Sequence, residues 1–388
     1  MSAAAPMLNA VRQEIAAIAD KIVVKVGTRT LTGPDGQLDM GQITSIADQI
    51  AGLRAEGRNV VLVSSGAVGA GIGRLGLTER PTDLSQLQAA AAVGQSCLIE
   101  CYNHALEKHG LHAAQVLLTA DDMHDRRRYL NARNTLRALF EYGAVPIVNE
   151  NDTVRVEELR RSMGDNDRLA ALVTNLIRAP LMVLLTDVEG LYDGHPKDEG
   201  SKVIPLVREL DEVLEHAGES SNEGLRLSTG GMASKLQAVQ ISTEAGENVV
   251  IANGRRPNVL RDILAGETIG TLFIAAGASV RDRKRWIGWS VHPEGKLRLD
   301  AGAEHAIAEE GGSLLAVGIT GVEGNFDKGD VVSLVGPSGE EFARGQTNYG
   351  SDDVRQVMGE PTERFGEILG SWSYYDVVHR DNLTVLRA

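Results

Sequence analysis

The stretch Ile22-Val23-Val24-Lys25-Val26-Gly27-Thr28 places a lysine inside an apolar run that ends at a glycine. The run predicts a buried strand. An ammonium group is costly to bury unless it meets an anion, and a glycine lets backbone N–H groups approach such an anion closely. The stretch therefore predicts an anion-binding turn at the end of a core strand, or a lysine that reaches solvent along the strand end.

Similar apolar runs alternate with amphipathic helical stretches through the first two-thirds of the chain. Val60-Val61-Leu62-Val63 and Leu181-Met182-Val183-Leu184-Leu185 are continuous rather than alternating in polarity, which is typical of a parallel sheet covered on both faces. The pattern predicts an α/β fold, a three-layer sandwich with a mainly parallel sheet, in which ligands bind at the carboxyl ends of the strands. Expected strands are 22–26, 60–64, 114–118, 145–149, 181–186 and 248–252, and expected helices are 40–56, 84–109, 126–142, 166–177 and 235–245.

The pattern of expected secondary structure changes beyond the basic run Arg281-Asp282-Arg283-Lys284-Arg285-Trp286. An alternating strand at 296–300, a short helix at 304–310 and a hairpin around Pro337-Ser338-Gly339 predict a small, mostly β second domain. The predicted organisation is an N-terminal extension or short helix at 1–20, an α/β domain at 21–278, a linker at 279–293 and the small domain at 294–388.

Composition narrows the classes of function. Lys and Arg number 39 against 53 Asp and Glu, a net charge of −14, which opposes binding of nucleic acid or anionic membrane by the whole chain. No apolar run is long enough to span a bilayer, and the N-terminus lacks the features of a signal peptide. Cys97 and Cys101 are too few for a metal site and are interpreted as ordinary thiols in a reducing, cytoplasmic setting.

A glycine-rich segment follows the second expected strand, at Ser64-Ser65-Gly66-Ala67-Val68-Gly69-Ala70-Gly71-Ile72-Gly73. Strand, glycine loop and helix form a frame that binds anions at a helix N-terminus. The spacing fails the dinucleotide fingerprint, and no acidic residue stands at 86–88, so a nicotinamide-dependent oxidoreductase is disfavoured. The alternative is that these glycines serve close packing of the helix on the sheet.

Polar side chains gather at three further points. Asn149-Glu150-Asn151-Asp152 ends the fourth expected strand, and Gly164-Asp165-Asn166-Asp167 opens a helix. These groups could bind a cationic amino group, a magnesium-bound phosphate, or Lys25 together with a second lysine, Lys235, whereas helix capping would explain only one of them. Thr186-Asp187 ends the fifth strand, where it could touch a ligand or start a turn.

A second lysine closes the segment Thr229-Gly230-Gly231-Met232-Ala233-Ser234-Lys235. The segment is not a Walker A motif, because Ser234 stands where that motif requires glycine. A P-loop nucleotidase is therefore disfavoured, and an ordinary flexible turn before a helix at Lys235 is the competing interpretation.

In this order, the motifs resemble the glutamate 5-kinase branch of the amino-acid kinase family. The resemblance covers nearly the whole chain, from Lys25-Val26-Gly27-Thr28 to Thr229…Lys235, and the last domain resembles a PUA domain, a small β-barrel-like module. The appended PUA domain distinguishes this branch from the aspartate, acetylglutamate and nucleoside-monophosphate kinases.

The resemblance implies an ATP- and Mg²⁺-dependent transfer to the side-chain carboxylate of L-glutamate. The products are L-glutamyl 5-phosphate and ADP, in the first step of proline biosynthesis, with proline as feedback inhibitor and a homo-oligomer expected. It implies that Lys25 and Lys235 contact the transferring phosphoryl group and that Asp167 holds both lysines. Substrate-binding residues would be Ser65, Gly66, Asn149, Asp152, Asp165 and Asn166, and ATP-binding residues Lys25, Thr186, Asp187, Thr229, Gly230, Gly231, Met232, Ala233, Ser234 and Lys235.

Two features depart from what the resemblance implies. The family often carries a lysine shortly before Gly-Asp-Asn, whereas this chain has Arg160-Arg161-Ser162-Met163 in a slightly longer loop. Either Arg161 does that lysine's work, or the loop differs in substrate handling or feedback control. PUA domains commonly bind RNA, but residues 291–388 carry 8 basic and 17 acidic residues, a net charge of −9. Such a surface disfavours an RNA-binding or RNA-modifying protein and favours a role in oligomerisation or regulation.

Overall fold

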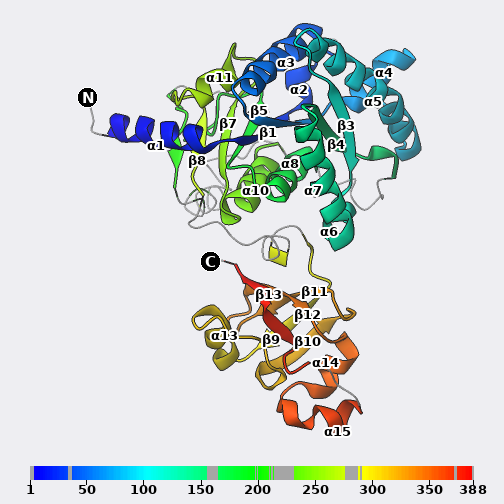
Figure 1. The fold of residues 1–388 in the computed structure, drawn as a ribbon, viewed down its shortest axis with the longest axis vertical. Coiled ribbons are helices and arrows are strands. Elements are labelled where there is room, and N and C mark those ends of the chain that lie inside the picture. The colour runs from blue at the N-terminus through cyan, green and yellow to red at the C-terminus, as the bar shows by residue number, and fades with distance from the viewer. Residues whose placement is uncertain are drawn as a thin grey trace. The chain divides into compact units, whose positions relative to one another are not determined.

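The structure is a computed structural model, and it describes residues 4–33, 37–154, 165–196, 198, 200–208, 210, 213, 231–275, 287–288, 291–370 and 374–386. The chain divides into two compact units, the first of which runs to Ala278 (Figure 1). Three features discussed from the sequence lie outside the described residues. They are the basic run 281–285, the departure from the family pattern at 160–163, and the ATP contacts expected of Thr229 and Gly230.

An eight-stranded sheet forms the centre of the first unit, in the order β3-β4-β2-β1-β5-β7-β8-β6. Its six long strands run parallel to one another, and β8 pairs antiparallel to β7. The α/β prediction is confirmed, and each of the six expected strands is correct to within one residue. The strands are β1 Lys21–Val26, β2 Asn59–Ser64, β3 Ala113–Leu118, β4 Val145–Glu150, β5 Leu181–Thr186, β6 Leu206–Val207, β7 Asn248–Asn253 and β8 Thr271–Phe273.

Helices cover this sheet on two faces (Figure 1). Every second residue of the central strands, such as Val24, Leu62 and Val183, joins one apolar core with side chains of α1, α3, α5 and α11. Lys25 alternates with Val24 and Val26 along β1, so its side chain lies on the opposite face of the strand. Helix α8 also contacts β1. The helices of this unit are α1 Ala4–Ile18, α2 Thr28–Leu31, α3 Met40–Ala55, α4 Ala67–Leu75, α5 Leu84–Glu107, α6 Ala120–His124, α7 Arg126–Glu141, α8 Asp165–Ile177, α10 Gly231–Glu244 and α11 Val259–Leu264.

The N-terminal segment forms helix α1, which packs into the first unit. Ile15 and Ala16 belong to its apolar core. Arg12 is buried, and its guanidinium donates hydrogen bonds to the carbonyl oxygens of Pro205 at 2.7 Å and Ile269 at 2.8 Å. Burial lowers the pKa of Arg12 to about 10, so the side chain stays charged at neutral pH. The helix therefore ties together two loops at the antiparallel edge of the sheet.

Glycines bring α4 and α5 into direct backbone contact. A Cβ on Gly71 would lie 1.7 Å from the carbonyl oxygen of Ala90, and a Cβ on Gly94 would lie 1.7 Å from that of Ala67. Gly66 precedes α4 with φ of +106°, a conformation that favours glycine. Part of the glycine-rich segment thus serves close packing, but the packing partner is helix α5 rather than the sheet. This contact fixes the start of α4 beside the end of β2.

We expect Gly94→Ala to lower the free energy of unfolding by roughly 1–3 kcal/mol, because the added methyl group forces the two helices apart. The matched control is Gly52→Ala on α3, where an added Cβ meets nothing within 4 Å. That change should be neutral or should stabilise the helix by about 0.5–1 kcal/mol. Urea unfolding of both variants makes the comparison, and equal stabilities would contradict the close contact.

The second unit is built on a five-stranded sheet in the order β10-β9-β11-β12-β13. The predicted hairpin is confirmed as the antiparallel pair β11 and β12. The apolar core of the second unit includes Leu297, Leu334, Phe365 and Val378. The strands are β9 Gly295–Leu299, β10 Ile319–Gly324, β11 Val331–Val335, β12 Glu341–Thr347 and β13 Val378–Val385, and the helices are α13 Ala301–Ala308, α14 Ser351–Val357 and α15 Phe365–Leu369.

Candidate active site

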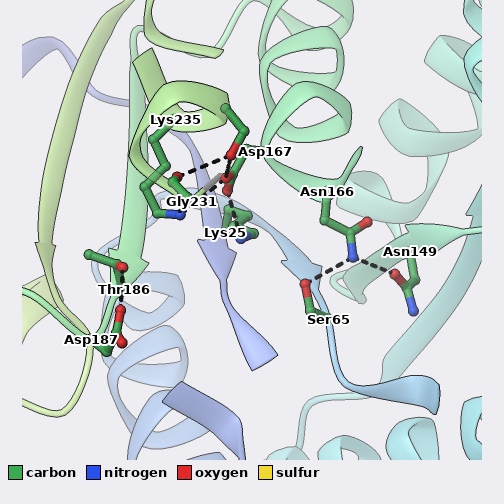
Figure 2. Close-up of polar contacts among 10 residues, drawn as sticks. Lys25, Ser65, Asn149, Asn166, Asp167, Thr186, Asp187, Gly231 and Lys235 are labelled. Atoms are coloured by element: carbon green, nitrogen blue, oxygen red, sulfur yellow. Dashed lines mark hydrogen bonds and ion pairs between the residues drawn. The ribbon is translucent and has the colours of Figure 1, made fainter. Parts of the chain in front are cut away.

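Two lysines converge on one buried carboxylate at the carboxyl end of β1. Lys25 Nζ lies 2.6 Å from Asp167 Oδ1, and Lys235 Nζ lies 3.2 Å from Asp167 Oδ2. Figure 2 shows both ammonium groups directed at this carboxylate. Asp167 is 1% exposed to solvent, whereas the side chain of Lys235 is 13% exposed. The group is therefore a largely buried ion-pair network in which Lys235 is the most exposed member.

Each member of this network is positioned by a different element. Asp167 is the third residue of α8, and Lys235 lies in the second turn of α10. Lys235 Nζ also donates to the carbonyl oxygen of Gly231 at 3.0 Å, and Ser234 Oγ donates to Asp167 Oδ2 at 3.0 Å. The N-terminal ends of α8 and α10 thus meet at the strand end that carries Lys25.

The electrostatics of the three groups are coupled. Burial is the largest influence on Lys25 and lowers its pKa, while the attraction of Asp167 acts in the opposite direction. Burial on its own would raise the pKa of Asp167, but Lys25 and Lys235 hold that carboxyl below its usual range. Asp167 is consequently ionised at neutral pH, and with both lysines protonated the network carries one net positive charge.

A second polar cluster lies next to the first, at the start of α8. Asn166 Nδ2 donates to Ser65 Oγ at 2.9 Å and to Asn149 Oδ1 at 2.9 Å (Figure 2). The Oδ1 atom of Asn166 is buried and has no hydrogen-bond partner among the described residues. An unsatisfied buried acceptor costs free energy, so this oxygen needs a donor that the described residues do not supply.

Thr186 is the last residue of β5, and Asp187 follows it. Thr186 Oγ1 donates to Asp187 Oδ1 at 3.1 Å, and Arg29 Nη1 lies 3.2 Å from Asp187 Oδ2. Burial alone would raise the pKa of Asp187, but hydrogen bonds from the backbone, Arg29 and Thr186 lower it. These side chains line the same edge of the sheet as Lys25, since β1 and β5 are neighbouring parallel strands.

The structure brings together seven of the predicted site residues in two contiguous clusters: Lys25, Asp167, Ser234 and Lys235 in one, and Ser65, Asn149 and Asn166 in the other. Gly66 precedes α4, Asp165 begins α8, and Asp152 lies in the turn that follows β4. Thr186 and Asp187 pair with each other beside these clusters.

One prediction about the second lysine is wrong. Gly231, Met232, Ala233 and Ser234 form the first turn of helix α10, whereas the sequence predicted a loop and a helix from Lys235. The segment was expected to be a flexible turn, but the side chains of Ser234 and Lys235 both donate to the Gly231 carbonyl oxygen and stabilise a helical turn there.

Sequence reasoning missed two arginines beside the site. Arg29 stands one residue beyond the Lys25–Thr28 motif, so extending that motif would have found it. Arg255 follows β7 and donates to backbone carbonyl oxygens of Arg29 and Thr32. No motif marks Arg255, because its partners come from a distant part of the chain.

The described residues contain neither a cluster of metal-ligating side chains nor a membrane-spanning helix. Within those ranges, no group of three or more His, Cys, Asp or Glu side chains is arranged to hold a metal ion. None of the helices placed there is long and apolar enough to cross a membrane. Cys97 and Cys101 are free thiols.

Comparison with known proteins gives matches over nearly the whole chain. The model of the amino acid kinase family matches residues 20–253, and that of the PUA domain matches residues 295–369. The chain is 47% identical to "Glutamate 5-kinase" of Rhodopirellula baltica, over 97% of this chain and 96% of that protein. It is 44% identical to the "Glutamate 5-kinase" of Syntrophus aciditrophicus, over 98% of both proteins. Among solved structures, UMP kinase from Ureaplasma parvum matches with a TM-score of 0.44 and 16% identity, over 66% of this chain and 98% of that one.

Proposed function

The chain belongs to the amino acid kinase family, and from this premise we propose that it transfers a phosphoryl group from ATP to the side-chain carboxylate of L-glutamate. The products are L-glutamyl 5-phosphate and ADP, and the reaction is the first step of proline biosynthesis. The observation that carries the proposal is the pair of ammonium groups of Lys25 and Lys235, held by Asp167 at the carboxyl end of β1.

The geometry fits a reaction between two anions. A glutamate side chain with a pKa near ~4.3 is ionised at neutral pH, so the nucleophile needs no general base. Repulsion between the carboxylate and the phosphates is the main obstacle. Lys25 and Lys235 offset it by contacting the phosphoryl group as it transfers, and Asp167 keeps both lysines in place.

The second cluster supports the glutamate site. Asn166 Oδ1 is a buried acceptor without a described partner, and the α-ammonium group of glutamate is a donor of the right kind. Ser65 and Asn149 orient the Asn166 amide through its Nδ2 atom. The remaining proposed contacts come from Gly66, Asp152 and Asp165, which lie at the ends of the neighbouring elements.

ATP is proposed to lie beside Thr186, Asp187 and the segment 229–235. Asp167 is already paired with two lysines, and the described residues offer no cluster that would hold Mg²⁺. We therefore propose that Mg²⁺ arrives with ATP, bound by its phosphates. Feedback inhibition by proline, a homo-oligomeric state and a cytoplasmic location are part of this proposal.

A coupled assay of ADP release tests the function. We expect ATP-dependent turnover with L-glutamate and at least about 100-fold lower kcat/KM with N-acetyl-L-glutamate, which lacks the ammonium group proposed to meet Asn166 Oδ1. L-aspartate, one methylene shorter, should also be poor because its carboxylate does not reach the phosphoryl group. Turnover with none of these, or with a nucleoside monophosphate alone, would overturn the proposal. Salt-sensitive RNA binding without kinase activity would favour the RNA-binding alternative.

A further inference from the structure

With both lysines protonated, the Lys25–Asp167–Lys235 network carries one net positive charge, yet the proposed reaction brings a polyphosphate and a carboxylate together. A further cation at the same strand ends would ease this imbalance. We propose that Arg29 is an ATP-binding residue that contacts the polyphosphate, and that Arg255 positions it through helix α2. This inference rests on the proposed function, since it concerns the same nucleotide site.

Arg29 stands beside the turn that follows Lys25. The backbone N–H of Gly27 donates to the carbonyl oxygen of Leu185 at 3.2 Å, which joins the ends of β1 and β5. Arg29 lies two residues after Gly27, and Asp187 lies two residues after Leu185. Arg29 Nη1 is 3.2 Å from Asp187 Oδ2. Arg29 is thus held on the rim of the edge where Lys25 and Thr186 lie.

The guanidinium of Arg29 is free to bind an anion. Its side chain is 81% exposed, and only Nη1 contacts a described residue, the carboxylate of Asp187. A guanidinium presents five donors in a planar fork that matches phosphate oxygens. Exposed ion pairs contribute little to stability. Arg29 can therefore leave Asp187 for a phosphate, or contact both at once, at little cost in free energy. Asp187 therefore orients Arg29 without satisfying it.

Arg255 fixes the short helix that carries Arg29. Its Nη2 donates to the carbonyl oxygens of Arg29 at 3.0 Å and Thr32 at 2.6 Å, where helix α2 ends. Its Nη1 lies 3.5 Å from Asp39 Oδ2. A four-residue helix has little stability of its own, so these bonds determine where its backbone lies.

The preceding glycine supports the same contact. A Cβ on Gly254 would lie 2.6 Å from Thr30 Cγ2 and 2.9 Å from Leu185 Cβ, so α2 rests directly on the end of β7 and beside β5. Gln42 Nε2 also donates to the Gly254 carbonyl oxygen at 2.6 Å. Arg255 acts through this packing, which makes it a positioning residue and leaves the nucleotide contact to Arg29.

The first test replaces Arg29. We expect Arg29→Ala to raise the KM for ATP and the calorimetric Kd for ATP by about tenfold, the loss of one charge-assisted contact, with kcat within about threefold and the KM for glutamate unchanged. The ATP affinity of the variant should also fall less steeply with salt. Arg298→Ala is the control, because Arg298 is an exposed arginine, paired with Glu323 at 2.6 Å, in the second unit. An ATP affinity equal to that of the control would overturn the proposal.

The second test separates positioning from a general structural role. Arg255→Ala should raise the KM for ATP when Arg29 is present and change it little in the Arg29→Ala background. Arg256→Ala, which removes a neighbouring pair with Asp262 at 3.6 Å, should leave the KM unchanged. Additive effects of Arg29→Ala and Arg255→Ala would overturn the positioning role.

The calorimetric measurement uses ATP without glutamate. If the unchanged protein binds ATP through Arg29 but does not phosphorylate glutamate, the inference holds and the proposed function fails. If it phosphorylates glutamate and Arg29→Ala binds ATP normally, the function holds and the inference fails.

Discussion

Lys235→Ala is expected to lower kcat by about 10²–10³-fold while the protein stays folded. Lys235 Nζ is one of two ammonium groups beside Asp167, and its side chain, at 13% exposed, is more accessible than that of Lys25 at 7%. Removing one preorganised charge that meets the transferring phosphoryl group costs roughly this factor, by comparison with the loss of one donor in an oxyanion hole. The release of ADP with saturating ATP and glutamate measures the change.

The variant leaves Asp167 with two partners, Lys25 and the hydroxyl of Ser234. The carboxylate is therefore not stranded, and the thermal midpoint should change little. Lys108→Ala, which removes an exposed lysine at the end of α5, is the matched control for charge. Near-normal turnover in the Lys235→Ala variant would remove the basis of the assignment.

Much of the first unit could be predicted because strands that are buried on both faces of a parallel sheet appear in the sequence as continuous apolar runs. The runs 60–63 and 181–185 lie in strands with five and six buried residues, which is why their polarity does not alternate. The shorter strands β6 and β8, with two and three residues, leave no comparable trace. In the second unit, β10 contains two glycines and β13 contains His-Arg-Asp, so neither resembled a strand.

The site was predictable as a set of motifs but not as a geometry. Lys25 was conspicuous because an ammonium in an apolar run needs an anion, and that anion is Asp167. Nothing local to Asp167 distinguished it from a helix-capping residue. Its role depends on the sheet order, which sets α8 against β1, and on α10, which brings Lys235 to the same point.

The roles of Arg29 and Arg255 depend still more on tertiary contact. Arg255 contacts the backbone of α2, and a backbone carbonyl carries no identity that a sequence pattern could reveal. For the glycine-rich segment 64–73 the sequence offered an anion site or packing of a helix on the sheet. It did not reveal that Gly71 lies against α5, or that Gly94 of α5 lies against α4, because this contact joins two helices.

Asp167→Asn is expected to abolish most of the activity and also to destabilise the fold, by about 3–5 kcal/mol at neutral pH. The substitution keeps the shape of the side chain but leaves the ammonium groups of Lys25 and Lys235 without their shared counter-ion. Lys25 is 5% exposed, and breaking a buried ion pair from one side costs this order of free energy. Urea unfolding measures the loss. Asp20→Asn, which removes a carboxylate from an exposed pair with Lys21 at 3.5 Å, should cost at most about 1 kcal/mol.

The pH dependence distinguishes this cause from a simple packing defect. The folded pKa of Asp167 is held below its unfolded value near ~3.9, so its stabilising contribution is complete above about pH 4 and is lost as the pH falls through the folded pKa. The difference between the original protein and the variant should therefore shrink in acid. It should shrink again in alkali, because the lowered pKa of Lys25 falls further without the carboxylate, and deprotonation relieves the unpaired charge. A difference in unfolding free energy that stayed constant from acid to alkaline pH would show that the shape of Asp167, and not its charge, holds the two lysines.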